Sequence, residues 1–180
     1  CNEPESFRAL NIPLGCEGKE RELAKNILTV ACSGGRISIV KELLLQWIVK
    51  EDDWWKEKKR KWLIQLIDDS EVLWHASIGG HVRVVERILE VAGINVNVGG
   101  GASLYSAIEN GHTKVVEALL AAKDIIVNIE DAHTGSTHNP HVSRWSTASV
   151  YTSSSPLERA KLFNHTEIIK LLIDAGALCS

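Results

Sequence analysis

Four stretches of the chain repeat one pattern of apolar and polar positions. In each stretch, two adjacent apolar residues are followed by a second apolar pair four residues along. The four sets are Ile39-Val40 with Leu43-Leu44, Val84-Val85 with Ile88-Leu89, Val115-Val116 with Leu119-Leu120, and Ile168-Ile169 with Leu172-Ile173. Apolar residues at positions i, i+1, i+4 and i+5 form one stripe along an α-helix. The pattern therefore predicts four amphipathic helices, each with one face for a core.

A second pattern precedes each of these helices and predicts a shorter helix followed by a tight turn. Leucine stands seven residues before the turn position and alanine four before it: Leu28 and Ala31, Leu73 and Ala76, Leu104 and Ala107, Leu157 and Ala160. The turn position itself holds Gly35, Gly80, Gly111 or Asn164. Glycine adopts a left-handed backbone freely and asparagine tolerates it. We therefore expect a short helix, a left-handed turn and a longer helix, four times over.

This unit resembles the ankyrin repeat, and the stretch SPLERAKLFNHTEIIKLLIDAGA, residues 155–177, matches the family pattern most closely. The resemblance implies an all-α solenoid of stacked helix-turn-helix units with hairpin loops. It also implies a concave face that binds other proteins, without catalysis. The family opens its short helix with Thr-Pro-Leu-His. Here the histidine position holds Thr29, Trp74, Tyr105 or Glu158, so we expect the hydrogen bonds of that histidine to be lost.

Uneven spacing of the four units predicts two insertions. The steps from leucine to leucine are 45, 31 and 53 residues. We expect an N-terminal arm over residues 1–18, covering the first repeat, and an ankyrin-repeat domain over residues 19–180. Its repeats are predicted near 24–49, 70–98, 102–129 and 154–180, with insertions at 46–69 and 131–154 and a shortened hairpin at VGGGAS. Lys161 stands where a following repeat would bury it, which favours the fourth repeat as a C-terminal cap.

The first insertion is rich in tryptophan and lysine. Trp55, Trp62, Leu66 and Ile67 fall on one helical face, which predicts a helix over about 52–67 packed on the array. The run Lys58–Lys61 suggests the alternative of a nuclear or nucleic-acid-associated regulatory protein that uses residues 56–62. Six acidic residues balance the six basic ones in this stretch, which favours packing over nucleic-acid binding.

Composition narrows the function further. The net charge is −3 and no apolar run approaches 18 residues, so we expect neither nucleic-acid nor membrane partners. The chain has no recognisable catalytic spacing, and we expect no enzyme activity and no cofactor. His133, His138 and His141 lie in an ordinary loop composition without cysteine, so we expect no metal site. Asn164-His165-Thr166 has the pattern of an N-glycosylation site, but Asn164 occupies the turn position, so we interpret it as a structural residue and not as a glycosylation site.

The four cysteines are too scattered for a disulfide scaffold. Our hypothesis is that any bridge joins Cys1 to Cys16. Cys32, at a packing position between repeats, is expected to be a small buried residue, and Cys179 to stay reduced. The chain lacks methionine and begins with Cys1. This fits a secreted protein delivered into a host cell as an effector; otherwise we expect a cytoplasmic or nuclear location.

The resemblance places the partner site on the short helices, next to the turns. We expect Leu162, Phe163 and Trp145 to be apolar anchors, with Arg159 and Glu109 at the rim. The remaining candidates are His75, Ile78, Ser106 and Asn110. The alternative is that Leu162 or Phe163 only packs under the loop of residues 131–154. We expect the chain to be a monomer that binds one partner protein.

Overall fold

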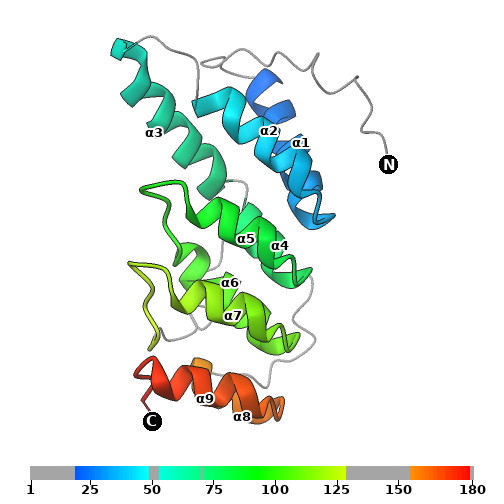
Figure 1. Ribbon diagram of the computed structural model, residues 1–180, viewed down its shortest axis with the longest axis vertical. Helices are drawn as coiled ribbons and strands as arrows, with labels where there is room; N and C mark the ends of the chain where they lie inside the picture. The colour runs from blue at the N-terminus through cyan, green and yellow to red at the C-terminus, as the bar shows by residue number, and fades with distance from the viewer. Residues whose placement is uncertain (1–18, 49–52, 70, 129–154, 179–180) are drawn as a thin grey trace. The chain divides into compact units, whose positions relative to one another are not determined.

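Every regular element in the described part of the chain is a helix, as the apolar pattern predicts. The computed structural model describes residues 19–48, 53–69, 71–128 and 155–178. The helices, labelled in Figure 1, are α1 (Lys19–Ser33), α2 (Ile37–Ile48), α3 (Asp53–Asp69), α4 (Val72–Ile78), α5 (Val82–Leu89), α6 (Val98–Glu109), α7 (Thr113–Leu120), α8 (Pro156–Leu162) and α9 (Thr166–Asp174). The chain divides into unit 1, Cys1–Asn95, and unit 2, Val96–Ser180.

Unit 1 consists of two helix-turn-helix pairs and the inserted helix α3. The first helices of the two pairs, α1 and α4, pack against each other, as do the second helices, α2 and α5. The predicted order of a short and then a longer helix is wrong in the first pair, because α1 has 15 residues and α2 has 12. Helix α3 contacts α1, α2 and α4. Helix α1 turns Ala24, Leu28, Ala31 and Cys32 toward this core, and all four are buried.

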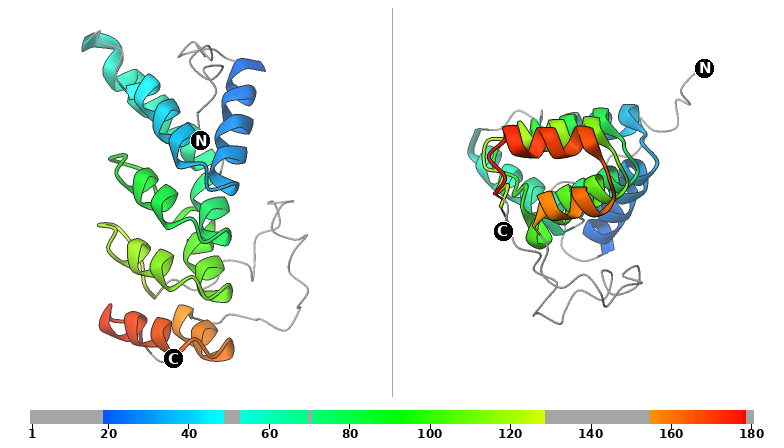
Figure 2. Two further views of the ribbon diagram at one scale, coloured as in Figure 1. Left: turned by 45° about the vertical axis from the view of Figure 1, so that its right-hand side comes forward. Right: turned by 90° about the horizontal axis from the view of Figure 1, so that it is seen from below.

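Unit 2 consists of two further pairs in two layers. Helix α6 packs on α8 and α7 on α9, and Figure 2 shows the two layers when the molecule is seen from below. The predicted stripe fills the core between them, because Val115, Val116, Leu119, Ile168 and Leu172 are all buried. Ile173 departs from the prediction, since 53% of it is exposed.

The left-handed turns are confirmed at all four predicted positions. The φ angles are 63° at Gly35, 68° at Gly80, 69° at Gly111 and 58° at Asn164. Each turn closes its short helix with a hydrogen bond to the carbonyl of the repeated alanine: the amides of Arg36, His81, His112 and His165 donate to the carbonyls of Ala31, Ala76, Ala107 and Ala160 over 2.9–3.0 Å. Together with the bond from the turn residue itself, this is the Schellman arrangement that ends a helix at a left-handed residue.

The VGGGAS segment, where a shortened hairpin was predicted, forms a left-handed turn at its glycines. Gly99, Gly100 and Gly101 have φ angles of 65°, 68° and 79°, so the right-handed part of α6 starts at Ala102. The amide of Gly101 donates to the carbonyl of Asn97 over 3.1 Å, which closes the turn. Glycine alone adopts this conformation at three successive positions without a steric cost.

The inserted helix α3 confirms the helix predicted over 52–67 and the burial of Leu66 and Ile67 on its predicted face, but not the burial of Trp62. Leu63, Leu66 and Ile67 are buried, whereas Trp62 is only half-buried. The buried face is therefore centred one residue later than predicted, which turns Trp62 to its edge. An ion pair of 2.7 Å between Arg21 and Asp69 holds the end of α3 against α1. The side chains of Trp47, Trp54 and Trp55 lie outside the described part of the chain.

Candidate functional site

Helix α8 begins with a capping box that takes the place of the family's missing histidine bonds. The amide of Glu158 donates to the Ser155 hydroxyl over 3.4 Å, and the amide of Ser155 donates to the Glu158 carboxylate over 3.0 Å. Pro156 at the first helical position lacks an amide hydrogen that would otherwise need a partner. These reciprocal bonds fix the start of α8 and hence the direction of its exposed side chains.

The α8–α9 turn lies against the α6–α7 turn in unit 2 through the ring of His165. Nε2 of His165 is 3.5 Å from the carbonyl oxygen of Glu109, at the long limit of a hydrogen bond. Phe163 stacks on the same ring, with centroids 6.2 Å apart and planes 8° from parallel. His165 therefore connects the two turns, and its ring stacks on the ring of Phe163.

Unit 1 contains the equivalent histidine contact. Nε2 of His81 is 2.9 Å from the carbonyl oxygen of Ser33, which stands at the same place before Gly35 as Glu109 does before Gly111. The contact of these histidines with the preceding turn was not predicted from the sequence. The recurring pair of a turn residue followed by histidine was the available signal.

Arg159 was predicted at the rim of the surface, and this prediction is wrong: its side chain is buried inside unit 2. Only 5% of it is exposed, it forms an ion pair with Glu109, and its guanidinium lies 5.3 Å from the ring centroid of Tyr105. The physical reason is that a buried guanidinium is stabilised by a carboxylate together with an aromatic face. Arg159 therefore joins α8 to α6 and does not contribute to the exposed surface of α8.

Two large apolar side chains are exposed beside this buried pair. Leu162 is 57% exposed and Phe163 is 39% exposed, both at the end of α8. Asn110 is exposed on the α6–α7 turn, and its side-chain amide donates to the carbonyl of Ser106 over 2.8 Å. Ser106, Glu109 and Asn110 thus stand at the end of α6, and Leu162 and Phe163 at the end of α8, the helix that packs on α6. Trp145 lies outside the described residues.

The two candidates in unit 1 lie on α4. Ile78 is 38% exposed, and His75 is half-buried with its ring edge against Trp74, at a centroid distance of 4.7 Å. These positions belong to the same register of the repeat as the candidates in unit 2. Their role in binding stays a prediction.

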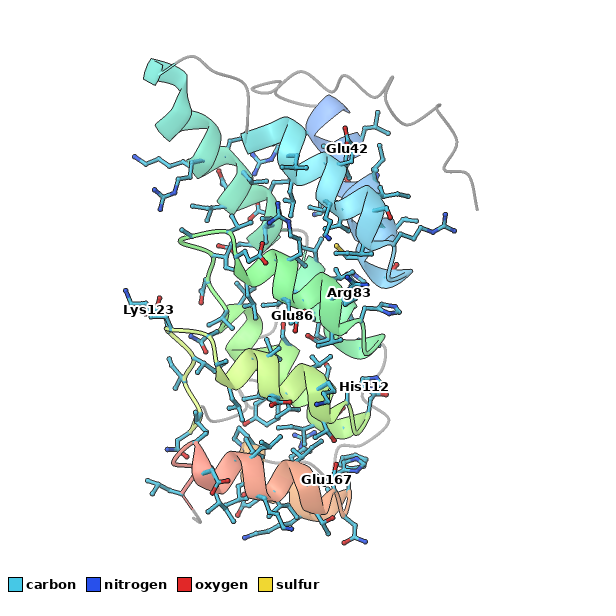
Figure 3. All side chains as sticks on the ribbon, viewed as in Figure 1. Glu42, Arg83, Glu86, His112, Lys123 and Glu167 are labelled. Carbon is cyan, nitrogen blue, oxygen red and sulfur yellow. The ribbon has the colours of Figure 1, made fainter. Side chains whose placement is uncertain are left out.

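The loop ends of the repeats are joined by side chains that sequence reasoning did not single out. In unit 2, Asn97 accepts from the amide of Ile126 over 3.0 Å and donates to the carbonyl of Asp124 over 2.7 Å. Asn128 makes the equivalent bonds to Leu178 and Gly176. Figure 3 shows Lys123 at this loop end of unit 2, with His112 and Glu167 at the turn end.

Asp68 at the end of α3 has the corresponding role in unit 1. Its carboxylate accepts from the amide of Asn95 over 3.3 Å. Partial burial raises the pKa of this carboxyl above its ordinary value, and the neighbouring charge of Asp69 raises it further, against the bond from Asn95. The inserted helix thus supplies the bond that a loop asparagine supplies in unit 2.

Other candidate chemistry has a structural explanation or falls outside the description. Cys32 is fully buried, as expected, and burial raises the pKa of its thiol to about 12. Within residues 19–48, 53–69, 71–128 and 155–178, no three His, Cys, Asp or Glu side chains are grouped to hold a metal ion. No described helix has the length and apolar character needed to cross a membrane. Cys1, Cys16, Cys179 and the three loop histidines lie outside these residues.

The basic segment proposed for nucleic-acid binding is described only in part. Arg60 and Lys61 are exposed, and Arg60 donates to the carbonyl of Ala92 over 3.4 Å. That bond gives Arg60 a structural role between α3 and the segment after α5. The side chains of Lys58 and Lys59 lie outside the description.

Comparison with known proteins identifies the repeat. A family model for ankyrin repeats, in three copies, matches residues 28–131, which is more than half of the 180 residues. No curated protein gives a significant match. The fourth helix pair, α8 and α9, lies beyond the matched residues. Ankyrin repeats are protein–protein interaction modules and are generally not catalytic. From the matched repeats and the repeated turn geometry, we conclude that the chain belongs to the ankyrin-repeat family.

Proposed function

We propose that the chain binds a partner protein through the turn surface of unit 2, which we define as Ser106, Glu109, Asn110, Leu162 and Phe163. The observation that carries the proposal is the exposure of two neighbouring large apolar side chains. Leu162 and Phe163 are 57% and 39% exposed although the same repeat buries Leu157, Ile168 and Leu172 completely. Exposed apolar groups with a polar rim are typical of protein-binding sites.

The turn surface is also held in one conformation before any partner binds. The capping box fixes the start of α8, the Schellman bonds fix its end, and His165 supports Phe163 from below. An ordered surface loses little conformational entropy on binding, so more of its contact energy appears as affinity. Large aromatic side chains in such surroundings often contribute most of the binding energy.

The chemistry of the surface indicates what it can recognise. Leu162 and Phe163 suit an apolar side chain of the partner, and the exposed amide of Asn110 suits a backbone or amide group. Arg159 is already paired with Glu109, so the surface offers no open guanidinium to an acidic partner. We infer that the partner presents an apolar anchor flanked by neutral polar groups.

The test uses the whole chain as bait with two matched double variants. Leu162→Ser/Phe163→Ser removes the proposed anchors, whereas Ile173→Ser/Leu178→Ser removes two exposed apolar side chains elsewhere in unit 2. We expect a partner captured by the original chain to be lost by the first variant and retained by the second. A partner that both variants retain equally would contradict the proposal. That result would favour the alternative in which Leu162 or Phe163 packs under the loop of residues 131–154 and does not contact a partner.

The proposal is confined to binding. Secretion and delivery into a host cell remain a prediction from the sequence, tested by following the location of the intact gene product. His75 and Ile78 remain candidate contacts on unit 1, tested by measuring whether the affinity of an identified partner falls on replacing Ile78 with serine.

A further inference from the structure

The turn between α6 and α7 contains a chemically reactive pair of residues. Asn110 is the only asparagine of the chain that is followed by glycine. In such a pair the backbone nitrogen of the glycine can attack the side-chain amide carbon of the asparagine, because glycine has no Cβ to obstruct the approach. The turn needs glycine at position 111 for its φ angle of 69°. The repeat therefore requires the residue that makes Asn110 reactive, and Asn110 is exposed to water.

The reaction has two steps and consumes only water. In the first step the nitrogen of Gly111 loses its proton and bonds to Cγ of Asn110, and the side-chain nitrogen leaves with a proton as ammonia. A five-membered succinimide ring remains. In the second step water opens the ring. Cleavage of the new bond to nitrogen leaves aspartate, and cleavage of the original peptide bond leaves isoaspartate, whose backbone runs through the former side chain.

The folded turn keeps the two reacting groups apart. The amide of Gly111 donates to the carbonyl of Ile108 over 3.0 Å, so it retains its proton. The side-chain amide of Asn110 donates to the carbonyl of Ser106 over 2.8 Å, which turns the side chain back along α6. Ring closure needs the nitrogen of Gly111 on the side of Cβ of Asn110, whereas a ψ angle of 1° places it toward the amide nitrogen of Asn110 itself. The attack therefore requires the turn to open.

His165 of the next repeat restrains this turn on both sides of Asn110. Its Nε2 lies 3.5 Å from the carbonyl oxygen of Glu109, and its ring lies directly beside Gly111. Opening of the α6–α7 turn would break the first contact and disturb the second. The packing of α8–α9 on α6–α7 thus also controls how often Asn110 can react.

We propose that Asn110 is a self-modification site, converted to aspartate or isoaspartate at a rate that the opening of the α6–α7 turn determines. Aspartate cannot donate to the carbonyl of Ser106, and its charge stands beside Glu109 at the negative end of the α6 dipole. Isoaspartate adds an atom to the backbone of a turn that the bond from His112 to Ala107, 2.9 Å long, holds closed.

Either product therefore destabilises the closed turn. The change is permanent, because the ammonia is lost to the solvent. Since Asn110 belongs to the turn surface of unit 2, conversion also weakens partner binding there, a consequence that rests on the proposed function. The chemistry itself needs no partner.

The experiment measures the conversion of Asn110 in the full chain at mildly alkaline pH, without a partner. Peptide mass spectrometry detects the exchange of the amide for a carboxylate, and chromatography separates the aspartate and isoaspartate products. We expect the folded chain to convert at least about tenfold more slowly than the same chain unfolded in guanidinium chloride, because the closed turn must first open. Equal rates in the two states would overturn the proposal.

Two matched variants test the restraint by histidine. His165→Ala removes the ring beside Gly111, and we expect conversion to be about fivefold faster, the effect of one lost hydrogen bond on the opening equilibrium. His81→Ala removes the equivalent ring from the α1–α2 turn and should leave the rate of the original chain unchanged. Circular dichroism melts establish that both variants are folded. An unchanged rate in His165→Ala, or equal acceleration in the two variants, would overturn the proposal. Because no partner is present, failure of the proposed function would leave all these rates as they are.

Discussion

The imidazole of His165 occupies the space that a side chain at Gly111 would need. A Cβ atom added at Gly111 would lie 2.8 Å from Cε1 of His165, closer than such atoms approach in proteins. The same relationship holds in unit 1, where a Cβ at Gly35 would lie 2.5 Å from Nδ1 of His81. Glycine at these turns is therefore needed for the left-handed backbone and also for the histidine of the next repeat.

Alanine substitutions at Gly111 and Gly176 separate the cost of the left-handed backbone from the cost of displacing the histidine. Gly176 is the control that tests the backbone alone. Gly176 has a φ angle of 89°, but nothing lies within 4 Å of an added Cβ. We expect Gly176→Ala to lower the free energy of unfolding by about 1–2 kcal/mol from backbone strain alone. Gly111→Ala should cost about 2–5 kcal/mol, because the histidine must also move. Urea denaturation followed by circular dichroism measures both, and equal losses would refute the role of the histidine.

Glu109 should stabilise unit 2 more than an ordinary surface glutamate does. Glu109→Ala leaves the buried Arg159 without its carboxylate, and we expect a loss of about 2 kcal/mol in the free energy of unfolding. This is below the value for a fully buried pair, because the Glu109 side chain is 37% exposed. Glu117→Ala breaks an exposed pair with Lys114 and should cost under about 0.5 kcal/mol. Equal effects of the two changes in the same denaturation assay would show that Arg159 does not depend on Glu109.

The inserted helix should be anchored by Leu63 rather than by Trp62. Leu63 is 2% exposed, so Leu63→Ala should cost about 2–5 kcal/mol of the free energy of unfolding. Trp62 is half-buried, and we expect Trp62→Ala to cost less than Leu63→Ala, about 1–2 kcal/mol. Thermal melts of the two variants decide the matter. A larger loss for Trp62→Ala would return the buried face to the one predicted from sequence.

Burial of Cys32 should make the fold sensitive to alkaline pH. The pKa of its thiol rises from 9.0 to about 12 in the folded chain, so above pH 9 the unfolded chain releases a proton that the folded chain keeps. Stability is therefore lost as the pH rises, by about 1 kcal/mol between pH 9 and pH 10. Cys32→Ala lacks this group, and its free energy of unfolding should fall less over the same interval. Parallel pH dependences in urea denaturation would contradict the effect.

The features that the sequence predicts are those that depend on local pattern. Gly35, Gly80, Gly111 and Asn164 were identified because a left-handed turn needs particular residues and the repeat shows it four times. Position in the repeat, by contrast, did not predict burial on the short helices. Val30 is 65% exposed, whereas Arg159 at the same repeat position is 5% exposed. Arg159 is buried because of Glu109 and Tyr105, which are distant in sequence, and no local pattern reveals them.

Hydrogen exchange of the chain with its captured partner tests the central proposal most directly. Amide exchange is compared, by mass spectrometry, between the free chain and the complex. We predict slower exchange in the complex at residues 106–112 and 159–165, the two turns that carry the turn surface of unit 2. Peptides from the loop end, residues 122–128 and 174–178, should be unchanged. Protection confined to the loop end, or to unit 1, would contradict the proposal.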